Sequence, residues 1–132
     1  MKRVFVDTGA WFAFFNQADP DHETVSSALL PLEGRLITSD YVFDELVTLL
    51  RYCINHKMAC AAGEALLNSQ VATLLSVGQA DINEAWRRFV AENDKRYSFT
   101  DCVSFALMKR IGLDTAVAVD PDFRRAGFSV LP

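Results

Sequence analysis

The sequence has few of the residues that build disulfide frameworks or zinc sites. Its 132 residues include three cysteines, Cys53, Cys60 and Cys102, and only two histidines. No CxxC pair and no cluster of cysteine with histidine occurs. An odd number of scattered cysteines indicates neither a disulfide framework nor a zinc centre.

Long apolar runs are missing as well. The first apolar run, residues 4–6, ends at Asp7, which is too early for the core of a signal peptide. No stretch approaches the ~18 apolar residues of a membrane span. We therefore expect a cytoplasmic protein that does not enter a membrane.

The chain also lacks linkers, internal repeats and low-complexity segments, so residues 1–132 are expected to form a single domain. Hydrophobic residues make up 51% of it, which predicts a packed core. The net charge of −4 does not favour nucleic-acid binding through the field of the whole protein. Local basic patches or bound cations can outweigh that total.

Short apolar runs alternate with segments of helical periodicity along the whole chain. Strands are expected at residues 4–6, 36–38, 72–77, 115–119 and 128–131, and helices at 10–15, 22–30, 41–55, 58–67, 79–93, 100–111 and 121–126. This alternation predicts an α/β fold, with a parallel sheet covered by helices on both faces.

Carboxylates recur where strands end and helices begin. Asp7 and Asp120 close two apolar strands, and Glu45 and Asp101 lie near the starts of two helices. Ser98 is a suitable N-cap for the second of these helices, with Asp101 at the capping-box position. Strand C-termini and the following helix N-termini share one edge of such a sheet, so the four acids can meet there.

Acids gathered in this way repel one another. Two like charges ~4 Å apart repel by about 4 kcal/mol at an effective dielectric near 20. Such a cluster persists when it is protonated, paired with basic groups or bound to cations. Oxygen-only ligands favour Mg²⁺ or Mn²⁺, and these ions suit phosphodiester chemistry.

Four segments in order resemble the motifs of the PIN domain family, and most closely the VapC-type toxins of bacterial toxin–antitoxin pairs. These segments are residues 6–11, 44–50, 98–106 and 118–123. The resemblance covers nearly the whole chain. It implies a three-layer fold with strand order 3-2-1-4-5, Mg²⁺- or Mn²⁺-dependent cleavage of RNA, a homodimer, and inhibition by a partner antitoxin.

The same resemblance assigns the site. The family's acids fall on Asp7, Glu45, Asp101 and Asp120, and its hydroxyl residue falls on Thr8. Asp7, Asp101 and Asp120 are expected to hold the ion, and Glu45 to complete the shell directly or through water.

Two neighbouring acids compete with these assignments. Asp44 adjoins Glu45, but adjacent helical residues point ~100° apart, so only one of them faces the site. Asp122 follows Asp120 and is either an outer ligand or a solvated helix residue.

Two alternatives to a nuclease stay open at this point. A phosphoacceptor receiver domain is also a small α/β fold with Asp at strand ends, but the acidic pair and the late Lys that it needs are not visible. A non-catalytic PIN-fold binding module is the other alternative. Basic pairs flank the acid-bearing segments and either are solvated or hold an RNA backbone. These pairs are Lys95-Arg96, Lys109-Arg110 and Arg124-Arg125.

Overall fold

Five short parallel strands form the centre of the structure, a computed structural model that describes residues 2–132. The strands are β1 (Val4–Val6), β2 (Leu36–Ser39), β3 (Thr73–Leu75), β4 (Thr115–Val117) and β5 (Ser129–Leu131). They lie in the order β3-β2-β1-β4-β5, and every neighbouring pair is parallel. The α/β class and the strand order expected from the sequence are both confirmed.

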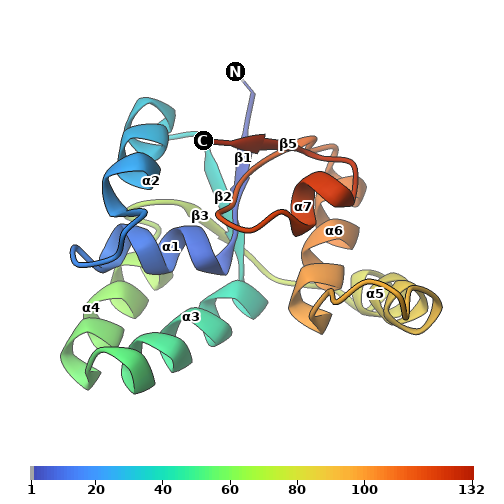
Figure 1. The fold of residues 1–132 in the computed structure, drawn as a ribbon, viewed down its shortest axis with the longest axis horizontal. Coiled ribbons are helices and arrows are strands. Elements are labelled where there is room, and N and C mark those ends of the chain that lie inside the picture. Colours follow the sequence, from blue (N-terminus) through green and yellow to red (C-terminus); the bar gives the residue numbers. More distant parts are fainter. Residues whose placement is uncertain (1) are drawn as a thin grey trace.

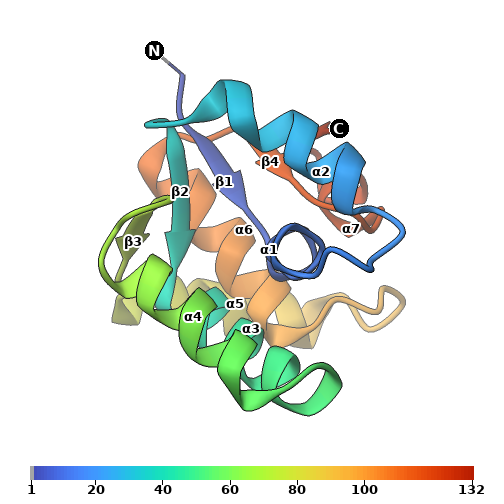
Figure 2. The same cartoon turned by 90° about the vertical axis from the view of Figure 1, so that its left-hand side faces the viewer.

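Helices cover both faces of this sheet and make three layers (Figure 1). On one side lie α1 (Thr8–Phe15), α2 (His22–Leu29), α3 (Asp40–Cys53) and α4 (His56–Leu67), and on the other α5 (Gln79–Ala91), α6 (Phe99–Ile111) and α7 (Asp122–Arg125). A short 3-10 turn, η1 (Leu30–Leu32), follows α2. In the view turned by 90°, α3 and α4 run side by side in front of the strands (Figure 2). Among residues 2–132, no helix is long and apolar enough to cross a bilayer.

The core packs against both faces of the sheet, because the strands are apolar on both sides. Phe105 of α6 and Phe123 of α7 meet edge to face, with ring centroids 4.9 Å apart. On the other face, fully buried Trp11 donates its indole N–H to the Thr38 hydroxyl at 3.1 Å. Thr38 in turn donates to the Val6 carbonyl at 3.1 Å, so this polar chain ties α1 and β2 to the central strand.

Local signals in the sequence explain where the helices begin and end. Ser39 caps α3 by accepting the Val42 N–H at 3.2 Å, and Ser98 caps α6 as predicted. Gly112 ends α6 with a positive φ of 76°, a conformation that glycine adopts without steric cost. Gly9 permits a close approach, because a Cβ at this position would lie 2.8 Å from the Val119 side chain.

Strands β3 and β4 are both shorter than predicted. β3 spans Thr73–Leu75 rather than residues 72–77, and the change at β4 bears on the site. β4 ends at Val117 rather than at residue 119, and Asp120 therefore lies in the connection to α7. Val119 is 43% exposed, so an apolar sequence continues past the buried strand. An apolar run alone does not mark where pairing with a neighbouring strand stops.

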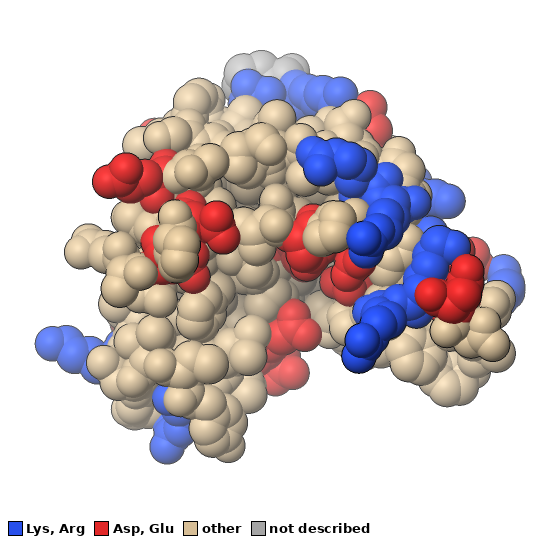
Figure 3. Space-filling model, in the orientation of Figure 1, with Lys and Arg blue, Asp and Glu red and all other residues tan. Residues whose placement is uncertain are grey.

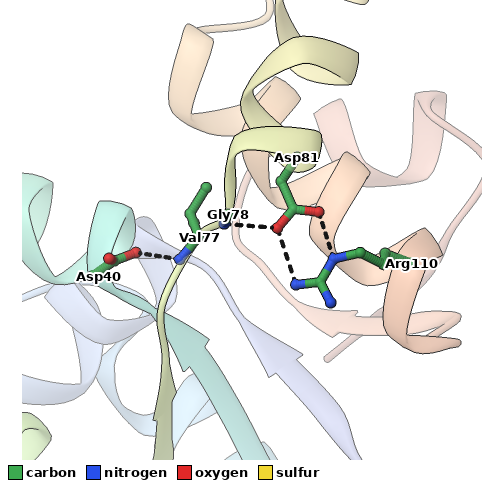
Figure 4. A network of polar contacts seen from close by, with 5 residues as sticks. All are labelled: Asp40, Val77, Gly78, Asp81 and Arg110. Atoms are coloured by element: carbon green, nitrogen blue, oxygen red, sulfur yellow. Dashed lines mark hydrogen bonds and ion pairs between the residues drawn. The ribbon is translucent and has the colours of Figure 1, made fainter.

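An ion pair between a buried carboxylate and a half-exposed arginine fastens α5 to α6 (Figure 4). Arg110 donates to both oxygens of Asp81, at 2.7 and 3.0 Å, and Asp81 is only 2% exposed. Asp81 also accepts the Gly78 N–H at 3.1 Å. The Arg110 guanidinium holds the pKa of the Asp81 carboxyl below its ordinary value. Burial acts in the opposite direction, but its effect on the pKa is smaller. On the other side of this turn, Asp40 accepts the Val77 N–H at 3.0 Å.

We expect Asp81→Ala to lower the free energy of unfolding at pH 7 by roughly 1–2 kcal/mol, because charge-assisted hydrogen bonds are lost. The pKa of Asp81 is lowered in the folded state, so its contribution is present above its unfolded pKa and fades as the pH falls below about 4. Urea denaturation at pH 7 and pH 3 measures both effects.

The control is Glu84→Ala on the same helix, which removes an exposed pair with Arg87. Exposed pairs contribute ~0–1 kcal/mol, so this change should be smaller. Equal losses in the two variants at pH 7 would show that the Asp81–Arg110 pair has no special role.

Candidate active site

Asp7 lies at the carboxyl end of the central strand and is the most deeply placed of the candidate acids. It is the N-cap residue of α1, and its side chain is 4% exposed. Its backbone N–H donates to the Val117 carbonyl at 3.1 Å, which fixes its position beside β4. Asp7 Oδ1 is buried without a hydrogen-bond partner among the described residues.

Asp101 is held in the first turn of α6 by a capping box. It donates its N–H to Ser98 Oγ at 3.0 Å, and its Oδ2 accepts the Ser98 N–H at 3.0 Å. The capping arrangement predicted from the sequence is therefore confirmed. It engages one carboxylate oxygen of Asp101 and fixes the direction of the side chain.

Asp120 does not directly close β4, as the sequence suggested, but lies three residues beyond its end. Its Oδ1 accepts the Asp122 N–H at 2.9 Å and so forms the turn into α7. Asp122 is half-buried and pairs with Arg125 at 3.4 Å. Asp122 is thus a neighbour of the acids rather than a fully solvated residue.

The acid of α3 lies on the opposite helical layer. Glu45 is half-buried in the second turn of α3, whereas the adjacent Asp44 is exposed. The difference in exposure follows from the ~100° between consecutive helical positions. It agrees with the preference for Glu45 over Asp44.

The charges of these acids act on one another. Burial raises the pKa of Asp7 well above its ordinary value, and the charges of Asp101, Asp120 and Glu45 raise it further, against one hydrogen bond from the Thr8 backbone. Burial, followed by the charges of Asp120 and Asp122, raises the pKa of Asp101 to about 6, although Ser98 opposes this change. The structure therefore brings all four predicted acids into one electrostatic group.

The arrangement has features that suit a cation, although its side chains do not already form a cage. Among residues 2–132, no three Asp, Glu, His or Cys side chains are placed as ligands of a single ion. The acids and Thr8 offer only oxygen ligands, and two of these oxygens, Asp7 Oδ1 and Thr8 Oγ1, are buried without a hydrogen-bond partner in the described part of the chain. A hard divalent cation would satisfy such oxygens and offset the repulsion among the carboxylates.

Basic residues border the acids on one side. Figure 3 shows red acidic side chains in the middle of this face and a band of blue Lys and Arg beside them. Arg124 is exposed and lines a cavity of about 250 Å³ together with Asp120. Arg110, in contrast, is engaged by Asp81 and belongs to the scaffold.

Sequence reasoning missed one group beside the acids. Arg88, Glu92 and Tyr97 form a polar cavity at the end of α5, next to the capping box of Asp101. These residues belong to no recognised motif. The only local signal is the helical i, i+4 spacing of Arg88 and Glu92.

The fold and the acid-bearing edge together define the class of this protein. The profile of the PIN domain family matches residues 4–129, so the chain belongs to the PIN domain family.

Individual relatives are similar over nearly the full chain. The "23S rRNA-specific endonuclease VapC20" of Mycobacterium tuberculosis is 36% identical over 126 residues, which are 95% of each chain. "Ribonuclease VapC26" of the same species is 29% identical over 131 residues, covering 97% of this chain and 91% of the relative. The crystal structure of VapC20, titled a sarcin-ricin loop cleaving toxin, superposes with a TM-score of 0.92 at 35% identity and covers 98% of this chain and 99% of that one.

We expect the stability of the metal-free protein to depend on Asp101 in a defined direction. The raised pKa means that the folded state binds a proton more tightly than the unfolded state. The associated stability is complete below the unfolded pKa near 4 and is lost as the pH rises through about 6. Urea denaturation of wild type and Asp101→Asn in EDTA should therefore show the variant gaining relative stability between pH 4 and pH 7.

Asp44→Asn is the matched control, because Asp44 is exposed. Its stability difference from wild type should stay nearly constant over the same pH range. A constant difference for Asp101→Asn as well would contradict the electrostatic coupling of the acids.

Proposed function

We propose that this protein is a metal-dependent endoribonuclease and the toxin of a toxin–antitoxin pair. The observation that carries the proposal is the buried Asp7 Oδ1, which lacks a hydrogen-bond partner among residues 2–132 and lies within the fields of Asp101, Asp120 and Glu45. The 36% identity to a protein named as a 23S rRNA-specific endonuclease supports RNA as the substrate. Ribosomal RNA is accordingly the first substrate to test.

In this proposal Asp7, Asp101 and Asp120 hold Mg²⁺ or Mn²⁺. The contacts described above engage one oxygen each of Asp101 and Asp120, at Oδ2 and Oδ1. Their other oxygens, together with Asp7 Oδ1, are the proposed ligands. The chemistry supplied by a bound cation is polarisation of a phosphate oxygen and activation of water.

The remaining residues orient the reactants. Glu45 lies on the facing helical layer and completes the ion's surroundings directly or through water. The Thr8 hydroxyl is buried without a partner and orients the phosphate or the ion. Water attacks phosphorus in line, the bond from phosphorus to the leaving oxygen breaks, and the RNA is hydrolysed into two fragments.

We expect Asp7→Asn to reduce RNA cleavage at least about 100-fold, because loss of one stabilising group at a reacting centre has effects of this size. Cleavage of ribosomal RNA in millimolar Mg²⁺ or Mn²⁺, followed by gel electrophoresis, measures the rate. Asp44→Asn is the matched control and should cleave at close to the wild-type rate.

A thermal melt gives a second readout that needs no substrate. Mg²⁺ or Mn²⁺ should raise the melting temperature of wild type but not of Asp7→Asn, since a ligand that binds only the folded state stabilises it. Undiminished cleavage by Asp7→Asn would overturn the assignment. A metal-dependent melt without any cleavage would favour the non-catalytic PIN-fold alternative.

The receiver-domain alternative does not fit this chain. Receiver domains have the strand order 2-1-3-4-5, whereas the order here is 3-2-1-4-5. Membership of the PIN domain family points the same way.

The proposed antitoxin has a suitable apolar surface in the groove between α3 and α4. The groove has a volume of about 370 Å³, and Phe43, Val47 and Leu67 are among its lining residues. Leu67 is 59% exposed and forms one contiguous apolar lining with Phe43 and Val47. Gly63 keeps the helices close, because a Cβ there would lie 3.2 Å from Val47. An apolar helical segment of the antitoxin would bury this surface.

The proposed homodimer uses a different face, on α5. Trp86 and Val90 are four residues apart and therefore share one side of this helix, with exposures of 58% and 60%. Phe89, stacked on Trp86 with centroids 5.7 Å apart, extends the apolar surface. In a two-fold symmetric dimer, this apolar face of one subunit would pack against the same face of the other subunit.

We expect Trp86→Glu to convert a dimer into a monomer, because it places a charge in the centre of the apolar face. Light scattering coupled to size-exclusion chromatography measures the mass. Glu84→Gln, an exposed change on the same helix, should leave the dimer intact. A monomeric wild-type protein at micromolar concentration would contradict the proposed assembly.

A further inference from the structure

A small polar cavity lies beside the acids, between the end of α5, the loop that follows it and the start of α6. Its volume is about 220 Å³, below the ~300–1,000 Å³ typical of sites for drug-sized ligands. It therefore suits a single planar ring system rather than a larger molecule. Its lining residues are Arg88, Phe89, Glu92, Asn93, Lys95, Tyr97 and Cys102.

The Arg88 side chain is held by an ion pair with Glu92 and by two aromatic rings, and Glu92 neutralises its charge. Its Nε donates to Glu92 Oε2 at 2.6 Å, and the two side chains are only 22% and 31% exposed. Its guanidinium lies over the rings of Phe105 and Tyr97, with its central carbon 4.8 and 5.4 Å from the ring centroids. The cavity thus presents a rigid, preorganised carboxylate and guanidinium side by side.

Tyr97 lines the same cavity, but its hydroxyl is closed off from the cavity surface. The residue is 6% exposed, and its hydroxyl is buried without a hydrogen-bond partner among the described residues. Asn93 and Lys95, on the loop, add an amide and an ammonium to the lining.

Two lining residues of the cavity are sequence neighbours of residues at the proposed catalytic site. Tyr97 precedes Ser98, and Cys102 follows Asp101. Ser98 and Asp101 are the two residues of the capping box, joined by two hydrogen bonds of 3.0 Å. A group bound in the cavity would therefore lie one residue along the chain from a carboxylate proposed to hold the ion.

We propose that this cavity binds one unpaired guanine base of the RNA, next to the phosphate that is cleaved. The inference rests on the endoribonuclease function proposed above and adds to it a site for base selection. Unpaired bases are read by proteins through stacking on aromatic rings and hydrogen bonds to their Watson–Crick edges.

The lining favours a base over a phosphate. The Glu92 carboxylate would repel a phosphate, and the charge of Arg88 is already matched by Glu92. The Watson–Crick edge of guanine carries two adjacent N–H donors and one carbonyl acceptor. Glu92 accepts from such donors, and the Lys95 ammonium donates to the carbonyl. Adenine lacks the carbonyl and uracil has a single donor, so both match this lining less well.

The test measures binding without cleavage. GMP, IMP, AMP, UMP and ribose 5-phosphate are titrated into the full chain in EDTA, and the NMR signals of residues 92–97 are followed. GMP is expected to shift these signals most strongly. IMP lacks the second N–H donor and should bind several-fold more weakly, and ribose 5-phosphate should leave the signals unchanged.

Variants separate recognition from folding. Glu92→Gln should weaken GMP binding about tenfold, equivalent to about 1.4 kcal/mol. Asn93→Ala, in the exposed loop, should weaken it less without disturbing the ion pair. Glu84→Gln is the matched control on the outer face of α5 and should bind GMP as wild type does.

Three results would overturn the inference: equal shifts with ribose 5-phosphate, equal binding of AMP, UMP and GMP, or no shift with GMP. Failure of the proposed function is distinguished by the cleavage assay. RNA cleavage without GMP binding would contradict only the proposed base site. GMP binding without any RNA cleavage would contradict the proposed nuclease function.

Discussion

The structure depends on one unfavourable placement, the carboxyl group of Asp7 at the carboxyl end of the central strand. Burial and three neighbouring acids all disfavour its ionised form. A fold tolerates such a group only when the rest of the chain holds it there. Apolar β1 is paired on both sides, α1 starts immediately after it, and the backbone of Asp7 is bonded to Val117. The packing of the sheet therefore maintains an electrostatic repulsion that the proposed cation would relieve.

The two helical layers contribute different residues and surfaces around Asp7. The layer of α1 to α4 contributes Glu45 and the groove proposed for the antitoxin. The layer of α5 to α7 contributes Asp101, the turn that carries Asp120, and the cavity proposed for a guanine base. The Asp81–Arg110 pair fastens α5 to α6 and so holds that cavity beside the acids. The proposed site of inhibition thus lies on a different helical layer from Asp101 and Asp120, whereas the proposed base site adjoins them.

Particular residues show how far the sequence could be interpreted. The capping box of Ser98 and Asp101 is a local pattern with a local cause, and it was predicted correctly. The order of the strands followed from the family resemblance and is confirmed. The end of β4 was misplaced by two residues, because the apolar residues 118 and 119 continue beyond the last strand pairing. The Arg88–Glu92 cavity was not predicted, because its walls come from two helices and the loop that joins them, and no motif marks them.

The sequence by itself determined the α/β alternation, the acids at strand and helix ends and the family motifs, because these depend on short-range periodicity and on residue type. Only the tertiary structure decided that Asp120 shapes a turn rather than closing a strand. It also decided that Arg110 pairs with Asp81, and that the Tyr97 hydroxyl is buried without a hydrogen-bond partner among residues 2–132. These properties are set by what packs around a side chain from distant parts of the chain. Burial and pairing are three-dimensional quantities that no local pattern encodes.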